Sequence, residues 1–363
     1  MEYILHIGVM INIYILLVLS ANLPIGMSNL LTMGQAAFYG VGAYISAFFL
    51  MQFNLPFIVV ALVVMLLTGV FSYLVSFASI KLKGDYFVLA TLGFQMIVYT
   101  VLYNWTDVTR GPYGVPGIPS ITFAGVALIS QMRYIMMAVA FLVAVSISVK
   151  SFSVVKEIFT WSINGMKKWK KIVLIVFGEL AVLFVNAYYW FCFVAGFFVR
   201  DDSQTFGYVV FANVLVLVTT LLFKNIKYSP YGRVLRALRN DEYSVAAMGR
   251  NPVAFKSWAF FFSAAFSGLA GLIYASYVSY IDPTSFTLDE SIFIISALFI
   301  GGTGNVRGPI LGALFVMILP EALRFVGMPD AIAANMRQII YGLALIVIMY
   351  FRPQGLWGET EIK

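Results

Sequence analysis

Long apolar runs, separated by short polar or charged stretches, dominate the chain. After Glu2 the next formally charged side chain is Lys81, and further uncharged stretches follow at 86–106, 203–223 and 257–281. A transmembrane helix needs ~20 mainly apolar residues, so the first run has room for three spans and each later stretch for one. A β-barrel would instead show alternating segments of ~10 residues. The pattern therefore predicts an all-α polytopic membrane protein.

Turn-forming and charged residues divide these runs into candidate helices. Pro24, Gly26 and Asn29 are expected to separate the first two spans. The stretches 33–47 and 290–312 are glycine-rich, so they are candidates for broken or re-entrant helices. About eleven spans are expected from the length of the apolar segments: 3–23, 33–52, 56–80, 86–104, 133–149, 172–199, 206–223, 257–280, 290–303, 309–326 and 332–351.

The basic residues indicate an orientation. The chain carries 23 Lys and Arg against 16 Asp and Glu, with a formal net charge of +7. If 224–256 lies in the cytoplasm and the spans alternate from there, most basic residues fall on the cytoplasmic side. Those left outside are Arg110, Arg133, Arg200, Arg324 and Arg337. Because cytoplasmic loops are enriched in Lys and Arg, the N-terminus is expected outside and the C-terminus inside. The positive charge is thus a topology signal and not a sign of nucleic-acid binding.

Residues 232–252, GRVLRALRNDEYSVAAMGRNP, are helical in pattern but too polar to cross a bilayer. Arg233, Arg236 and Arg239 recur every three residues with apolar residues between them, which predicts an amphipathic helix. The acids that follow Asn240 suit the first turn of a second helix. This segment either lies in the lipid headgroups with its arginines on anionic lipid or docks a cytoplasmic partner. Its acids and small residues favour the docking interpretation.

Side chains for catalysis or metal binding are scarce. The chain has one Cys and one His, which excludes an internal disulfide and leaves no metal or catalytic cluster. The stretch GGTGNVRGP (301–309) lacks the Lys-Ser/Thr pair of a phosphate-binding loop, so no cofactor is expected. Its glycines are instead expected to form a tight turn between two short helices, with Gly304, Gly308 and Gly312 spaced for close helix contact. The glycines of this turn are Gly301, Gly302, Gly304, Gly308 and Gly312.

Two further features limit the alternatives. The N-terminal stretch lacks the basic region of a signal peptide, so it is expected to be a retained span. An ion-coupled secondary transporter is the rival from another class. It would need intramembrane carboxylates or inverted repeats, and the spans hold few acids and no convincing repeat.

Several motifs, in this order along the chain, resemble one family. They are LTMGQAAFYGVGAYISA (31–47), LKGDYFVLATLGFQMI (82–97), TRGPYGVPGIP (109–119, expected to be a rigid loop), SPYGRVLRALRNDEYSVAAMGRNPVAFK (229–256), SAAFSGLAGLIYASYVSYIDPTSF (263–286), SIFIISALFIGGTGNVRGPILGA (291–313) and FRPQGLWGE (351–359). They are similar to signatures of the LivM-type subunit of branched-chain amino acid ABC-importer permeases. The resemblance covers most of 1–130 and 205–360.

This resemblance implies one permease domain, 1–363, with about nine core spans plus an inserted pair. The chain would translocate branched-chain (hydrophobic) amino acids across the bacterial plasma (inner) membrane, without being an enzyme. Its expected partners are cytoplasmic ATP-binding subunits, a second homologous permease, an external or periplasmic substrate-binding protein and membrane lipid. Urea or short-chain amide permeases share nearly the same signatures and stay open as an alternative.

The resemblance also implies that 224–256 is a cytoplasmic coupling segment gripped by an ATPase. Polar contacts are expected from the charged side chains and close approach at the small ones. The expected coupling residues are Arg236, Arg239, Asp241, Glu242, Ala246, Ala247 and Gly249. For the translocation path the candidates are Gly40, Gly42 and Thr91, although each also suits simple helix packing.

One segment departs from the family pattern. Residues 135–205 form an insertion with two expected spans joined by a basic loop, KEIFTWSINGMKKWKK. A pair of spans preserves the orientation of everything that follows. Glu179 lies inside the second inserted span, where an acid is a functional candidate by default. Its proximity to Lys171 favours snorkelling or pairing with that residue.

Overall fold

The computed structural model describes residues 2–53, 55–79, 82, 84–120 and 204–324, with isolated positions further on. Several expectations lie outside these residues: the insertion with Glu179, the spans 133–149, 172–199 and 332–351, and, apart from Gly355, the motif 351–359. The chain divides into two compact units, Met1–Val9 with Gly125–Val214, and Met10–Ala124 with Leu215–Lys363. The second unit contains most of the described residues and all of the sites below.

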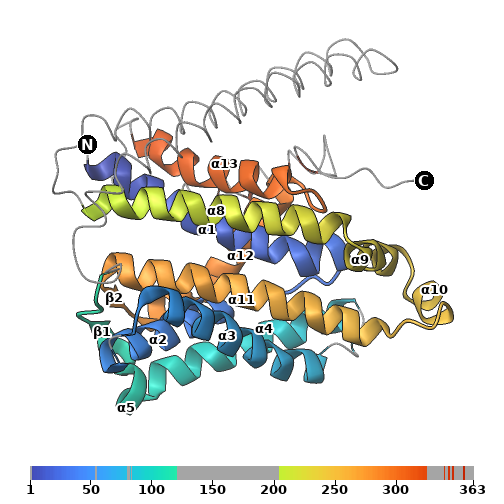
Figure 1. Cartoon of the computed structure of the whole chain (residues 1–363), viewed down its shortest axis with the longest axis horizontal. Helices are drawn as coiled ribbons and strands as arrows, with labels where there is room; N and C mark the ends of the chain where they lie inside the picture. Colours follow the sequence, from blue (N-terminus) through green and yellow to red (C-terminus); the bar gives the residue numbers. More distant parts are fainter. Residues whose placement is uncertain are drawn as a thin grey trace, which may run out of the picture. The chain divides into compact units, whose positions relative to one another are not determined.

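The described residues are mainly helical (Figure 1). In chain order the elements are α1 (Glu2–Asn22), the π-helical turn η1 (Leu23–Met27), α2 (Gln35–Phe53), α3 (Phe57–Ser79), α4 (Asp85–Asn104), α5 (Thr106–Thr109), the 3-10 turn η2 (Gly111–Tyr113), β1 (Val115–Pro116), α8 (Gln204–Tyr228), α9 (Pro230–Asn240), α10 (Glu242–Ala247), α11 (Pro252–Val278), β2 (Tyr280–Ile281), the 3-10 turn η3 (Pro283–Phe286), α12 (Leu288–Gly301) and α13 (Arg307–Arg324).

Several of these helices are long and apolar enough to cross a membrane. Within the described ranges there are five: Glu2–Met27, Gln35–Phe53, Asp85–Asn104, Gly207–Tyr228 and Pro252–Val278. Shorter apolar segments occupy Phe57–Tyr73 and Arg307–Leu319. Every span expected within the described ranges coincides with a helix, to within a few residues. The total number of spans and the orientation of the termini stay predictions.

The first helical break differs from the sequence expectation. We expected Pro24 and Gly26 to end the first span, but α1 passes into the π turn η1, which contains both residues. The helical path ends only after Met27, and Asn29 takes a left-handed conformation with φ 55°. A π turn accommodates the proline because it widens the spacing of the backbone hydrogen bonds locally. The break therefore lies between η1 and the start of α2.

The core of the second unit is formed where α11 packs against α2 and α3 (Figure 1). Gly42 of α2 faces Gly268 of α11 so closely that a Cβ on Gly42 would overlap the Gly268 backbone. Gly268 in turn faces the side chain of Thr68 on α3. Small residues at a crossing let helix backbones approach, which is how packing stabilises helix pairs inside a membrane.

The expectation of an all-α fold needs a small correction. The loop expected at 109–119 contains η2 and the two-residue strand β1, which pairs antiparallel with β2. In this pairing Val115 faces Ile281 and Pro116 faces Tyr280. The pairing is short, which suits a strand that contains proline. Positive φ angles at Arg110, Gly111, Gly114 and Gly117 turn the chain around it.

Candidate functional site: the charged segment and its anchors

The charged segment, defined here as residues 224–256, folds into two helices between α8 and α11. Ser229 caps α9 by accepting a hydrogen bond from the Gly232 amide at 3.2 Å. Leu235 and Leu238 are buried on the inner side of α9. A Cβ at Gly232 would overlap backbone carbonyls at the end of α8, so this glycine allows the sharp turn from α8 into α9.

The two candidate arginines of α9 are directed toward the protein. Arg236 donates from Nη2 to the carbonyl of Lys227 at 3.3 Å. Arg239 donates from Nη1 to the carbonyl of Gly26, in η1, at 3.1 Å. Charge-assisted hydrogen bonds of this kind are stronger than neutral ones. Both side chains therefore anchor α9 to the ends of α8 and α1.

Asp241 and Glu242 also make internal contacts. Asp241 is the N-cap of α10 and accepts hydrogen bonds from the amides of Tyr243 and Ser244, which confirms the second helix start. Hydrogen bonds from the Ser244 hydroxyl and the Tyr243 amide lower the pKa of Asp241. Glu242 forms an ion pair with Lys256 at 2.7 Å, and only 7% of the Lys256 side chain is exposed. This pair ties α10 to the first turns of α11.

The small candidates, in contrast, lie on the surface. Ala246, Ala247 and Gly249 are exposed, and Gly249 has φ 75° with open space where a Cβ would stand. Beside them Tyr243 is 72% and Met248 69% exposed. Exposed large apolar side chains that lie close together form a candidate contact surface. We call Tyr243, Ala246, Ala247, Met248 and Gly249 the α10 surface. Sequence reasoning missed its two large members, although an aromatic residue and a methionine among small residues were a visible signal.

A polar cluster connects the end of α1 with the turn between α12 and α13. The Asn22 side chain accepts from the Gly304 amide at 3.0 Å and donates to the Asn305 carbonyl at 2.8 Å. The buried Lys227 ammonium lies 3.5 Å from Oδ1 of Asn305. A Cβ on Gly26 would lie 2.6 Å from the Gly304 nitrogen. η1 thus contacts both α9, through Arg239, and this turn.

The glycines around this turn have two roles. The chain turns at these glycines between α12 (Leu288–Gly301) and α13 (Arg307–Arg324). Gly302 and Gly304 adopt positive φ angles of 105° and 81°. Gly301, Gly308 and Gly312 let the two helices touch, because a Cβ at any of them would overlap backbone atoms across the crossing. The close contact between α12 and α13 therefore involves Gly301, Gly308 and Gly312. Gly304, which was expected to take part in this contact, lies in the turn.

The three path candidates lie in packed surroundings. Gly40 faces the Phe286 ring, Gly42 faces Gly268, and the buried Thr91 hydroxyl accepts from the Met33 amide at 3.0 Å. Gly40 and Gly42 therefore allow α2 to pack closely against its neighbours, and Thr91 supports the N-terminal end of α2.

Buried polar side chains surround the first turn of α2. Gln35 donates to the Ser20 hydroxyl at 2.5 Å, and its side chain lies 3.4 Å from the Ser263 hydroxyl. Ser267 donates to the Gln35 carbonyl at 3.3 Å, and the Ser291 hydroxyl accepts from the Ala36 amide at 2.9 Å. These residues connect α1, α2, α11 and α12 within the apolar region. Among the described residues no group of three or more His, Cys, Asp or Glu side chains could hold a metal ion.

Comparison with known proteins places this architecture in a family. The chain is 29% identical, over 98% of its length and 70% of the relative, to the high-affinity branched-chain amino acid transport system permease protein LivM of Salmonella typhimurium. LivM of Escherichia coli is 29% identical over 96% of this chain and 68% of its own. A shorter match joins 38% of this chain to 43% of the E. coli permease protein LivH, at 25% identity. No solved structure gives a significant match.

The resemblance seen in the sequence motifs is therefore confirmed, and the chain is a multi-pass inner-membrane transport protein and not an enzyme. The family model described as the branched-chain amino acid transport system permease component matches residues 3–349. Because that match spans nearly the whole chain, the protein belongs to the family of branched-chain amino acid transport system permeases.

Proposed function

We propose that this chain is the transmembrane permease subunit of an ATP-binding-cassette importer for branched-chain amino acids. A binding protein delivers the substrate outside, and separate ATPase subunits on the cytoplasmic side supply the energy through the charged segment. A second homologous permease completes the pathway. The names of the LivM and LivH relatives support both the substrate class and the pairing of two permeases.

The observation that carries this proposal is the Arg239–Gly26 hydrogen bond. It joins α9, which crosses no membrane, to η1 at the end of a helix long enough to span one. A push on α9 is thereby delivered to α1. Through Asn22 it reaches Gly304 and the turn between α12 and α13. Rigid helices joined by directed hydrogen bonds can move as one body, as rocking transport mechanisms require.

The ATPase is proposed to grip the α10 surface. Its exposed Tyr243 and Met248 offer apolar anchors, and Ala246, Ala247 and Gly249 leave room for a partner backbone. Arg236, Arg239, Asp241 and Glu242 then act indirectly, because they hold the two helices in place for the ATPase. This proposal replaces the direct polar contacts with the ATPase that were expected of the four charged candidates and keeps the close approach expected at the three small ones.

The substrate path is proposed to run beside the N-terminal half of α2. This helix starts within the apolar region, where Gln35 lies level with Ser20 of α1. A helix that begins inside a membrane can direct amide groups toward a carboxylate. In the described conformation Gly40 and Gly42 keep α2 close to its neighbours, and Thr91 supports the loop before it. We therefore propose that these three residues fix the positions of the helices that line the path.

The test is ATP-driven uptake by the complete transporter in proteoliposomes, with Ala247→Trp compared with Val253→Trp. Both positions are exposed, but Val253 lies outside the α10 surface. We expect Ala247→Trp to reduce binding of the ATPase and uptake, with Val253→Trp close to the unchanged chain. Normal uptake by Ala247→Trp would exclude the α10 surface as the docking site.

The same vesicles separate the alternatives for substrate and energy source. Leucine, isoleucine and valine should enter only when ATP and the binding protein are present. Uptake of urea or short amides in their place would support the alternative permease class. Uptake driven by an ion gradient without ATP would overturn the proposal.

A further inference from the structure

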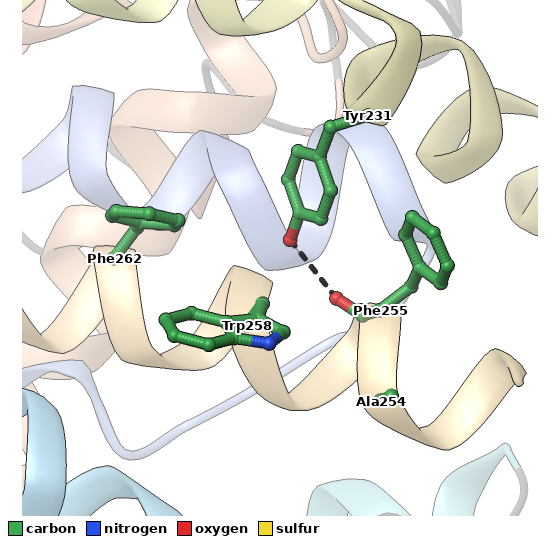
Figure 2. A pocket seen from close by; sticks show the side chains of 5 residues that line it. All are labelled: Tyr231, Ala254, Phe255, Trp258 and Phe262. Carbon is green, nitrogen blue, oxygen red and sulfur yellow. Dashed lines mark hydrogen bonds between the residues drawn. The ribbon is translucent and has the colours of Figure 1, made fainter.

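An aromatic notch opens at the charged segment, where α9 meets the first turns of α11 (Figure 2). Its lining consists of Tyr231, Ala254, Phe255, Trp258 and Phe262, and its volume is about 380 Å³. This volume is within the ~300–1,000 Å³ typical of ligand sites. The Tyr231 hydroxyl is used internally, because it donates to the Phe255 carbonyl at 3.0 Å. The notch therefore presents ring faces and an alanine methyl group.

The notch is continuous with an exposed apolar stripe on α3. The stripe residues recur every three or four positions and so share one helix face. They are Ile58, Leu62, Leu66, Val70 and Tyr73, exposed by 38% to 65%. The Tyr73 ring lies 6.2 Å from that of Trp258, which forms a wall of the notch. An apolar surface thus runs along a membrane-embedded helix and into the notch.

A positive charge lies at the other end of the notch. The exposed Arg250 guanidinium is 5.9 Å from the Phe255 ring centre. Glu242, in the same segment, is paired with Lys256. Tyr and Trp side chains gather at the boundary between lipid tails and headgroups, where arginines meet anionic headgroups. This order of stripe, aromatic notch and cation has the chemistry of one phospholipid.

We propose that the notch binds an anionic phospholipid from the leaflet on the side of the charged segment. The phosphate pairs with Arg250, and one acyl chain runs from there past Trp258 and Phe262 and then along the α3 stripe. The bound lipid bridges α9 and α11 beside the α10 surface. This inference does not depend on which substrate the permease carries.

The test measures lipid retention by the purified transporter complex in detergent, with phosphatidylglycerol and phosphatidylcholine as probes and native mass spectrometry as readout. Ala254→Phe fills the notch from an exposed position, and Arg250→Gln removes the charge. Val253→Phe adds the same ring next door, at an exposed residue that does not line the notch. Copurification of the ATPase and the second permease is recorded for every variant.

We expect the unchanged complex to retain phosphatidylglycerol over phosphatidylcholine. Arg250→Gln should weaken phosphatidylglycerol binding about five-fold, since one interfacial basic residue contributes about that factor. Ala254→Phe should reduce retention of both lipids, and Val253→Phe should reduce neither. Equal retention by all variants, or no preference for the anionic lipid, would overturn the proposal. So would loss of a partner subunit from Ala254→Phe with lipid retention intact, because the notch would then be a subunit interface.

A second measurement guards against misfolded variants. Phosphatidylglycerol carrying brominated acyl chains quenches nearby tryptophan fluorescence. Quenching is compared between the unchanged complex and the Trp258→Phe variant, which is otherwise intact. The difference between the two reports the lipid at the notch. No difference in quenching between the two forms would place the lipid elsewhere and contradict the site.

Discussion

Arg239 of α9 donates a hydrogen bond to the carbonyl of Gly26, 213 positions earlier in the chain, at 3.1 Å. The acceptor lies in a π turn, where backbone hydrogen bonding is irregular and carbonyls become available to other donors. The 11-residue helix α9, too short to span a bilayer, is thereby attached to the end of a helix long enough to span one. This contact ties α9 to the end of α1 in the described structure.

Replacing Arg239 with Met should uncouple transport from ATP hydrolysis. Hydrogen bonds of charged groups contribute about 1.5–3 kcal/mol, so we expect at least a ten-fold lower ratio of substrate transported to ATP hydrolysed. The measurement is uptake and ATPase activity in the same proteoliposomes. Arg233→Met, an exposed arginine on the same helix, is the control and should leave the ratio unchanged. A normal ratio in Arg239→Met would show that α9 is held by other contacts.

Replacing Gly42 with Ala should destabilise the core. The added methyl group would lie 2.6 Å from the Gly268 carbonyl oxygen, and overpacking of this kind costs about 1–3 kcal/mol. A lower midpoint of thermal unfolding in detergent would reveal the effect. Gly93→Ala in α4 is the matched control, since nothing lies within 4 Å of its added Cβ. It should be neutral or stabilising by up to about 1 kcal/mol, and equal midpoints for both variants would contradict the close crossing.

Replacing Gln35 with Leu should also lower stability, through its polar contacts. The variant removes the hydrogen bond to Ser20 and the contact with Ser263, at an expected cost of about 0.5–1.5 kcal/mol. Unfolding in detergent is again the measurement. Gln52→Leu makes the same change at an exposed position near the end of α2 and should stay within about 0.5 kcal/mol. An equally large loss of stability in Gln52→Leu would mean that the exchange of glutamine for leucine itself, and not the loss of the buried contacts, lowers stability.

Asp241 should make the start of α10 sensitive to acid. Its pKa is lowered in the folded chain by hydrogen bonds from Ser244 and Tyr243, so its stabilising effect is complete above the ordinary value of 3.8. The effect is lost as the pH falls through the lower folded pKa. At neutral pH, the hydrogen bonds to Asp241 should therefore slow hydrogen exchange of the Tyr243 and Ser244 amides. Asp241→Ala should exchange faster there, whereas Asp241→Asn keeps a capping oxygen and should remain protected. Equal exchange in all three forms would argue against the cap.

The sequence could predict most of the described helices because their cause is local. Apolar runs of membrane length must form helices that satisfy their own backbone in lipid, so α2, α4 and α11 were visible without tertiary information. The second helix start at Asp241 was visible for a similar reason, since a cap bonds amides two and three residues away. The glycine turn between α12 and α13 followed from composition in the same way.

The candidate site was only partly predictable. The spacing of Arg236 and Arg239 correctly gave an amphipathic helix, but both side chains meet carbonyls of other helices. The exposure of Tyr243 and Met248 could not be predicted, because whether an apolar side chain faces the core depends on how its helix packs. The lipid-binding notch needs rings from two helices, and no single stretch of sequence contains it.

By itself, then, the sequence determined the membrane class, the positions of the described spans, the family and the helical character of the charged segment. Only the tertiary structure decided that Arg239 reaches Gly26, that Gly42 faces Gly268 and that Asn22 meets the turn at Gly304. The physical reason is the distance along the chain over which each interaction acts. Helix periodicity and caps act over a few residues, whereas the partner of an inward-facing side chain depends on how separate helices pack in space.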